Sequence, residues 1–150
     1  MTFIQLNENE SLLKNNHYVQ LREFIKELQL RELPLEIIQS INKDLEEINT
    51  TALNKNQFNK LIKNKQTQII ELLEKELKIV PKNYYQTLWL ALGMAAFGIP
   101  IGVAFGLNFG NMAYLGIGLP IGMAIGIALG SQMDKKALVQ GRQLNIEIKY

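Results

Sequence analysis

The sequence of 150 residues contains no cysteine and only one histidine, His17. Without thiols, a disulfide framework and a thiolate metal site are excluded. His17 has no second metal ligand at helical spacing, so we expect a surface or boundary side chain and predict no metal site. The motifs GxxxxGKS/T, GxSxG and HExxH are absent. We therefore predict a protein that is not an enzyme, with no cofactor and no small-molecule substrate.

Charge is missing from a long stretch, Asn83 to Met133, in which 51 consecutive residues include no Asp, Glu, Lys, Arg or His. About 20 apolar residues suffice for one helical crossing of a bilayer. The stretch is long enough for two crossings, and Asn108-Phe109-Gly110-Asn111 supplies residues typical of a turn. We predict a transmembrane hairpin over residues 83–133, with helices at about 85–107 and 112–131, a turn at 108–111, and a cytoplasmic tail over 134–150.

The amino terminus lacks a basic segment followed by an apolar one, so we predict no cleavable secretory signal. Basic residues flank both ends of the hairpin, whereas its turn has none: Lys63, Lys65, Lys75, Lys78 and Lys82 before it, and Lys135, Lys136, Arg142 and Lys149 after it. The positive-inside rule then predicts that both termini lie in the cytoplasm and that only the turn reaches the other side. The net charge of +2 is close to neutral, so we predict no nucleic-acid partner.

Residues 1–82 show three amphipathic patterns, which predict helices at about 11–32, 35–49 and 57–79. Pro34 and Pro81 mark the ends of the first and third helices. The apolar stripes are Tyr18, Leu21, Phe24, Ile25 and Leu28; Ile37, Ile38, Ile41, Leu45 and Ile48; and Phe58, Leu61, Ile62, Ile69, Leu72, Leu73 and Leu77. They fit a three-helix cytoplasmic domain within one chain or a coiled coil between chains.

Two short segments have strand-like patterns. Phe3 to Leu6 is compatible with a strand, and Leu144 to Tyr150 alternates apolar and polar residues with period two. If both termini share one compartment, these two segments are able to pair.

The hairpin contains a direct repeat offset by 20 residues, Gly98 to Gly110 and Gly118 to Gly130, with 7 of 13 positions identical. The packing glycines recur every fourth residue: Gly98, Gly102, Gly106, Gly110, Gly118, Gly122, Gly126 and Gly130. Such spacing places small residues along one helix face, where backbones approach closely in lipid. The opposite faces are small too, with Pro100, Ala104, Pro120, Ala124 and Ala128. We predict two contacts per helix, one within the hairpin and one with another molecule.

Prolines and aromatic residues add two expectations about the hairpin. Pro100 and Pro120 are expected to kink their helices, because each removes a backbone donor. Tyr84, Tyr85 and Trp89 at one end and Tyr114 at the other are expected to anchor the hairpin at the membrane interfaces.

The alternation of small and large residues in both blocks also fits a hairpin of a multimeric β-barrel. Three features favour helices instead. The small face is Gly and Ala rather than polar, Pro100 and Pro120 interrupt any strand ladder, and Leu88 to Phe97 does not alternate.

The spaced glycines and the uncharged hairpin resemble bacterial glycine-zipper membrane proteins, and the run Gly116 to Gly126 is similar to one in small membrane proteins of Bacteroidota. The resemblance covers Tyr84 to about Gln143. It implies a multi-pass protein of the bacterial inner (cytoplasmic) membrane and brings no established activity.

Together these observations predict an all-α protein with a three-helix cytoplasmic domain and a glycine-zipper transmembrane hairpin. The first functional hypothesis is a non-enzymatic membrane protein that forms a homo-oligomer or docks into a larger membrane complex through its Gly and Ala faces, presenting its helical domain. The alternatives are a small oligomeric pore and a membrane tether for a cytoplasmic partner.

Overall fold

A computed structural model describes residues 2–7, 9–51 and 54–149. The chain forms two compact units. The first, called the helical unit, consists of residues 1–81 and 144–150, and the second, called the hairpin unit, consists of residues 82–143. The hairpin unit is therefore an insertion into the helical unit. This differs from the three consecutive segments 1–82, 83–133 and 134–150 that the charge pattern predicts.

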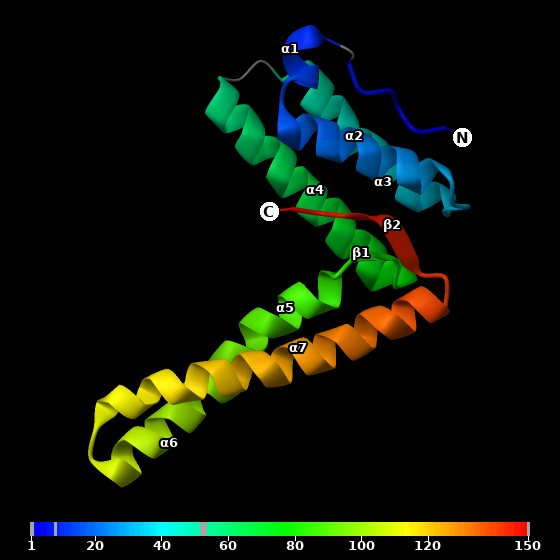
Figure 1. Ribbon diagram of the computed structural model, residues 1–150. Coiled ribbons are helices and arrows are strands. Elements are labelled where there is room, and N and C mark those ends of the chain that lie inside the picture. Colours follow the sequence, from blue (N-terminus) through cyan, green and yellow to red (C-terminus); the bar gives the residue numbers. More distant parts are fainter. Residues whose placement is uncertain (1, 8, 52–53, 150) are drawn as a thin grey trace. The chain divides into compact units, whose positions relative to one another are not determined.

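The helical unit contains α1 (Glu10–Leu13), α2 (Asn16–Gln29), α3 (Leu35–Thr50) and α4 (Lys55–Leu77), as Figure 1 shows. The three predicted long helices are confirmed as α2, α3 and α4, but the first one begins later than expected. The side chain of Asn15 accepts a hydrogen bond from the backbone N–H of His17 and caps α2. An asparagine side chain that accepts from a free backbone donor in this way favours the start of a helix, so α2 begins directly after Asn15.

The core of the helical unit lies between α2, α3 and α4 within one chain. Most residues of the predicted apolar stripes face it, but five of them are only half-buried: Ile38, Phe58, Leu61, Leu72 and Leu77. Ile70, which lies outside the predicted stripes, is buried. The largest fully buried side chains are Tyr18, Leu21, Phe24, Leu28, Ile41, Leu45, Ile62, Ile69, Ile70, Leu73, Val80 and Leu144. At roughly 2 kcal/mol for each large apolar side chain buried, this core is the main source of stability of the unit. Gln66 of α4 is buried among these residues as well.

The carboxyl-terminal tail forms a strand, but its partner is not the one that the sequence suggests. β2 (Gln143–Glu147) pairs with β1 (Val80–Lys82) in a two-stranded sheet. Pairing of the tail with Phe3 to Leu6 is therefore wrong. α4 ends at Leu77, and Lys78 adopts a left-handed conformation with φ of 57° that turns the chain into β1.

Phe3 to Leu6 lies extended along α3 and forms no strand. Two asparagines of α3 hold it: Asn42 binds the carbonyl of Thr2 and the N–H of Ile4, and Asn49 binds the carbonyl of Gln5 and the N–H of Asn7. Seven residues of helix rise about 10.5 Å, and three extended residues span about 10 Å. The distance between the two asparagines along α3 therefore matches the distance between the backbone groups that they bind. Phe3 and Leu6 of this segment are buried.

An ion-pair cluster joins α4 to α3. The ammonium group of Lys65 lies 2.9 Å from the carboxylate of Asp44 and 2.7 Å from that of Glu47. Hydrogen bonds to Glu47 and Asp44 raise the pKa of Lys65 above its ordinary value, because both stabilise the charged ammonium.

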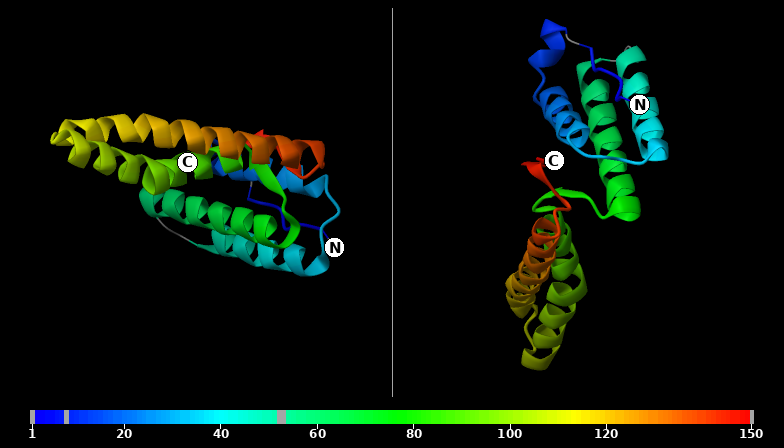
Figure 2. Two further views of the ribbon diagram at one scale, coloured as in Figure 1. Left: turned by 90° about the horizontal axis from the view of Figure 1, so that it is seen from below. Right: turned by 90° about the vertical axis from the view of Figure 1, so that its right-hand side faces the viewer.

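The hairpin unit contains α5 (Tyr84–Gly93), a π-helical turn η1 (Met94–Gly98), α6 (Ile99–Phe109), a short 3₁₀ turn η2 (Met112–Tyr114) and α7 (Leu115–Val139). In the views of Figures 1 and 2 the first three run side by side with α7. Both repeat blocks are helical, so the β-barrel interpretation is wrong. α7 continues past Met133 to Val139, through residues that the charge pattern assigns to the tail. Charged side chains mark the end of an apolar stretch, but they do not by themselves end a helix.

Each arm of the hairpin is long and apolar enough to cross a membrane. The two candidate spans are Tyr84–Phe109, with 26 residues, and Leu115–Val139, with 25. Only 22% of the most apolar window of each span is buried within the protein. The core helix of a water-soluble protein is mostly buried, so most of this apolar surface faces outward.

Candidate functional site

The contact between the two arms of the hairpin is built on glycine. A Cβ atom placed on Gly122 would lie 2.5 Å from the carbonyl oxygen of Gly93 and 2.6 Å from the Cα of Gly98. A Cβ on Gly102 would lie 2.6 Å from the carbonyl oxygen of Leu115. Real side chains do not tolerate such distances to backbone atoms. The backbones of the two arms therefore touch at positions where only glycine fits.

The predicted packing glycines do not all share this contact. Those in contact with the opposite arm are Gly98, Gly102, Gly118, Gly122, Gly126 and Gly130. Gly106 is buried as well. Gly110 lies instead in the turn, where a Cβ would meet nothing within 4 Å and φ is +63°. It ends α6 in left-handed geometry, which glycine adopts at low cost, so its role is conformational.

Gly93 belongs to the contact although the four-residue spacing omits it. It lies five residues before Gly98, and the π-helical turn Met94–Gly98 spans that interval. A π-helix has more residues per turn than an α-helix, so the interval of five returns the chain to the same face. The spacing of five was the signal for this turn in the sequence.

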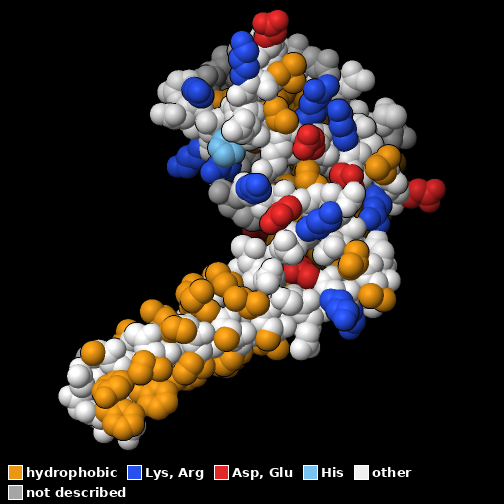
Figure 3. Space-filling model, viewed as in Figure 1, with side chains coloured by type: hydrophobic (Ala, Val, Ile, Leu, Met, Phe, Trp, Pro, Cys, Tyr) orange, Lys and Arg blue, Asp and Glu red, His pale blue; other side chains and the backbone are white. Residues whose placement is uncertain are grey.

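The large apolar side chains of the hairpin point outward. Figure 3 shows orange side chains over the hairpin and no blue or red ones along its outer part. The exposed residues include Leu92 at 45%, Ile99 at 48%, Leu107 at 73%, Phe109 at 62% and Ile117 at 48%. Small residues fill the interior instead. In a water-soluble fold the large apolar residues are the ones most often buried, so the hairpin has the reverse arrangement.

The second set of small residues faces outward as well. Pro100 and Ala104 of α6 and Pro120, Ala124 and Ala128 of α7 are all exposed. They line faces that the contact between the arms leaves uncovered.

The structure places the two prolines differently. Pro100 follows the π-helical turn directly, and the N–H of Ile99 donates to the carbonyl of Met94, five residues earlier. The wider turn makes room where the proline ring would otherwise meet the carbonyl of Ala96. Pro120 is the sixth residue of α7, which continues as helix through it. It therefore lies nearer the start of its helix than the predicted boundaries imply.

Aromatic residues lie at both ends of the hairpin. Tyr84 and Trp89 are half-buried near its open end. Tyr85 differs, since only 7% of it is exposed and its ring packs edge-on against Tyr84 at 5.2 Å. It is packed against protein and is poorly placed to anchor the hairpin. At the turn, Phe109 lies 6.1 Å from Phe105 and 5.1 Å from Tyr114, forming an exposed aromatic cluster.

Asp134 fastens the open end of the hairpin, a role that the sequence does not reveal. Its two carboxylate oxygens accept hydrogen bonds from the backbone N–H groups of Tyr85, at 3.1 Å, and Gln86, at 2.9 Å. The first turn of a helix leaves its N–H groups without a carbonyl partner inside the helix, and Asn83, at the capping position, makes no side-chain cap. Gly130 lies one turn earlier on α7 and lets the backbone of Gln86 come close enough for this contact. A carboxylate at a helix amino terminus is favourable because of the helix dipole.

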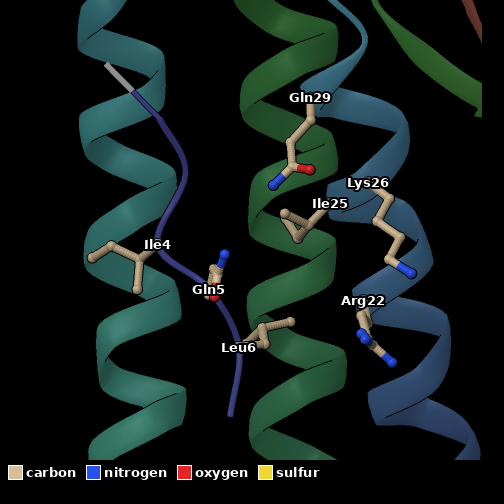
Figure 4. Close-up of a pocket in the computed structure, with 7 residues that line it drawn as sticks. All are labelled: Ile4, Gln5, Leu6, Arg22, Ile25, Lys26 and Gln29. Atoms are coloured by element: carbon tan, nitrogen blue, oxygen red, sulfur yellow. The ribbon is translucent and has the colours of Figure 1, made fainter. Parts of the chain in front are cut away.

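Two features of the described residues concern metal binding and a surface hollow. Among residues 2–7, 9–51 and 54–149, no three His, Asp or Glu side chains are grouped to hold a metal ion. A hollow between the amino-terminal segment and α2 is lined by Ile4, Gln5, Leu6, Arg22, Ile25, Lys26 and Gln29, as Figure 4 shows. These seven residues include no carboxylate, imidazole or hydroxyl group, and their two charged side chains, Arg22 and Lys26, are both basic.

Comparison with known proteins adds no functional information. No family model, no curated protein and no solved structure matches the chain. The candidate site is therefore the hairpin surface itself, with its glycine contact, its outward apolar side chains and its fastened open end.

Proposed function

We propose that this chain is a non-enzymatic integral membrane protein whose hairpin crosses the bilayer twice and whose helical unit lies in the cytoplasm. The observation that carries the proposal is the reversed packing of the hairpin, with glycine inside and Leu, Ile and Phe outside. Such an arrangement exposes a large apolar surface to water, which favours aggregation. Lipid tails solvate the same surface without cost, and close backbone packing then holds the arms together.

The open end of the hairpin supports the proposed orientation. Lys82, Lys135, Lys136 and Arg142 adjoin it, and the turn carries no charge. Basic residues remain on the cytoplasmic side during insertion, so both termini lie there and the turn reaches the other side. Tyr114 and the neighbouring phenylalanines then lie at the far interface.

The membrane part of the proposal is tested by cysteine labelling, because the chain has no cysteine of its own. We expect Asn111→Cys, in the turn, to react with a membrane-impermeant thiol reagent only from the non-cytoplasmic side. Gln39→Cys, on the exposed face of α3, should react only from the cytoplasmic side. Recovery of the full-length protein in the soluble fraction without detergent would overturn the proposal.

We further propose that the protein self-associates or docks into a larger membrane complex through its outer small faces. The support is that Pro100, Ala104, Pro120, Ala124 and Ala128 are exposed after the glycine contact has formed within one hairpin. In lipid, small residues allow helices to approach closely and gain dispersion energy. The glycines are already used, so the alanine face is the one to test.

Ala124→Leu is expected to abolish the assembly, whereas Ile121→Leu, an exposed and volume-conserving change on the same helix, should preserve it. Native mass spectrometry of the protein extracted in mild detergent reports the copy number and any co-purifying protein. A wild-type protein that is monomeric and has no companion contradicts the association. Ion flux through reconstituted vesicles would instead support a pore.

The insertion topology favours a membrane tether as a second candidate. The helical unit contains the chain on both sides of the hairpin, and β1 pairs with β2 where the chain leaves and returns. The unit is thus joined to the membrane segment at two points. Pull-down of a cytoplasmic protein that depends on helical-unit surface residues and not on Ala124 would support this candidate over assembly through the hairpin.

A further inference from the structure

The charged residues of the hairpin unit lie together at its open end. Residues 82–143 contain only five charged residues, of which four are basic and one is acidic, a net charge of +3: Lys82, Asp134, Lys135, Lys136 and Arg142. The helical unit has the remaining 12 basic and 13 acidic residues, a net charge of −1. The basic excess of the whole chain therefore lies at this one end of the hairpin.

The single carboxylate at this end does not neutralise the lysines. Asp134 is only 6% exposed, and its two oxygens accept hydrogen bonds from the first turn of α5. The positive end of the α5 dipole compensates its charge. Lys82, Lys135 and Lys136 have exposed side chains, and within the described part of the chain none of them forms an ion pair. Three ammonium groups are left to interact with an external anion.

The same end of the hairpin adjoins the exposed apolar surface. Leu88 of α5 is 43% exposed and Met133 of α7 is 37% exposed, and Trp89 lies beside Leu88. The apolar surface thus ends within two helical turns of the three lysines. In a bilayer, the layer that begins where the hydrocarbon ends is the layer of headgroup phosphates.

We propose that Lys82, Lys135 and Lys136 bind the headgroups of anionic phospholipids in the leaflet at the open end of the hairpin. The inference rests on the proposed function, because the lysines reach headgroups only if the hairpin lies in a bilayer. A lysine near an anionic membrane surface strengthens association by about fivefold. Three lysines together are expected to favour anionic over zwitterionic lipid by up to about a hundredfold at low salt.

The single tryptophan provides a local measurement. Trp89 is the only tryptophan of the chain, and it lies on α5 near the open end. Lipids with brominated acyl chains quench tryptophan fluorescence on contact. Full-length protein is reconstituted in two mixtures that contain phosphatidylglycerol and phosphatidylcholine in the same ratio. In one mixture the phosphatidylglycerol is brominated, and in the other the phosphatidylcholine is brominated. We expect stronger quenching when the bromine is on the anionic lipid, with the difference decreasing as salt is added.

The variant Lys82→Gln, Lys135→Gln, Lys136→Gln tests the assignment to these residues. Quenching should become equal in the two mixtures. The control variant Lys43→Gln, Lys60→Gln, Lys63→Gln removes three exposed lysines of α3 and α4, and it should keep the preference of the wild type. Quenching of both variants by brominated phosphatidylcholine shows that they are inserted and folded at the open end.

Three outcomes overturn the inference. Equal quenching of the wild-type protein in both mixtures shows that it lies in the bilayer without preferring anionic lipid, and leaves the proposed function intact. If the variant Lys82→Gln, Lys135→Gln, Lys136→Gln keeps the preference for anionic lipid, other residues are responsible for that preference. A preference that inorganic phosphate removes more effectively than chloride at equal ionic strength identifies a free-phosphate site. Absence of quenching by either brominated lipid would instead contradict the proposed function.

Discussion

The two units of this protein use opposite packing. In the helical unit, leucines, isoleucines and aromatic residues fill the interior, and the sequence of residues 1–81 and 144–150 contains no glycine. In the hairpin unit, which contains all 11 glycines, the contact between the arms is made by glycine, and the large apolar residues face outward. The comparison teaches that the solvent decides which side chains belong inside: water expels apolar bulk, whereas lipid does not.

The largest effect is expected when the two units are separated. If the hairpin is the part that lies in the membrane, as we propose, replacing residues 83–142 with a flexible Gly and Ser linker should give a soluble, helical protein. The reason is that the buried core of the helical unit comes from residues 1–81 and 144–150 alone. Centrifugation, circular dichroism and a cooperative thermal melt would measure this.

Additional deletion of residues 144–150 serves as the control for this experiment. It removes Leu144 and Ile148, which are 0% and 9% exposed, and should destabilise the soluble form by about 4 kcal/mol. If the linker variant is insoluble or unfolded, the two units do not have separate cores and the comparison fails.

The next largest effect concerns glycine within the hairpin. Gly122→Ala should destabilise the hairpin by about 3 kcal/mol, because its Cβ would overlap the backbone of the opposite arm. Gly116→Ala on the same helix meets nothing within 4 Å and should be neutral or stabilising by up to about 1 kcal/mol. Unfolding in detergent, followed by fluorescence of Trp89, compares the two variants. Equal melting temperatures would contradict the glycine contact.

A smaller effect is expected at Asp134. Asp134→Ala leaves the N–H groups of Tyr85 and Gln86 without their acceptor and should cost about 2 kcal/mol. Asp134→Asn keeps one acceptor oxygen and should cost about half as much. Hydrogen exchange at the first turn of α5 measures the loss locally. Unchanged exchange there in both variants shows that the carboxylate does not fasten the open end.

The smallest effect concerns the ion-pair cluster of the helical unit. Lys65→Met should cost about 1 kcal/mol, because the Glu47 side chain of the cluster is 49% exposed and water screens its attraction to the ammonium group. The folded-state pKa of Lys65 is raised above 10.5, so its stabilisation is present below that pH and is lost as the pH rises through the raised value. Thermal melts from pH 9 upward should show the wild-type protein converging on the variant, and parallel curves would contradict this assignment.

Local patterns predict the elements of this fold well. The stripe that includes Tyr18, Leu21 and Leu28 is buried as expected. Apolar residues that recur about every 3.6 positions lie on one face of a helix, and that face is the one that packs against the core. The uncharged stretch gives two long apolar helices. The boundaries are less predictable: Asn15 starts α2 with its side chain, and α7 extends to Val139. Capping and charge act over single residues, which a periodic pattern does not resolve.

Contacts between distant residues are not predictable from the same patterns. β1 is only three residues long and includes Pro81, so nothing in its sequence marks it as the partner of the tail. Asp134 accepts a hydrogen bond from the backbone N–H of Gln86, although 48 positions separate the two residues in the sequence. The capping position of α5 is occupied by Asn83 in a left-handed conformation, and only the folded backbone shows that its side chain does not cap this helix.

The sequence by itself determined where helices form, which residues face a core, and that one stretch of 51 residues carries no charge, because periodicity and composition are local properties of the chain. Only the tertiary structure decided that this stretch is an insertion, that its glycines join its own two arms, and that Asp134 closes its open end. The physical reason is that backbone donors and acceptors, and the space beside a glycine, acquire partners only when distant segments meet.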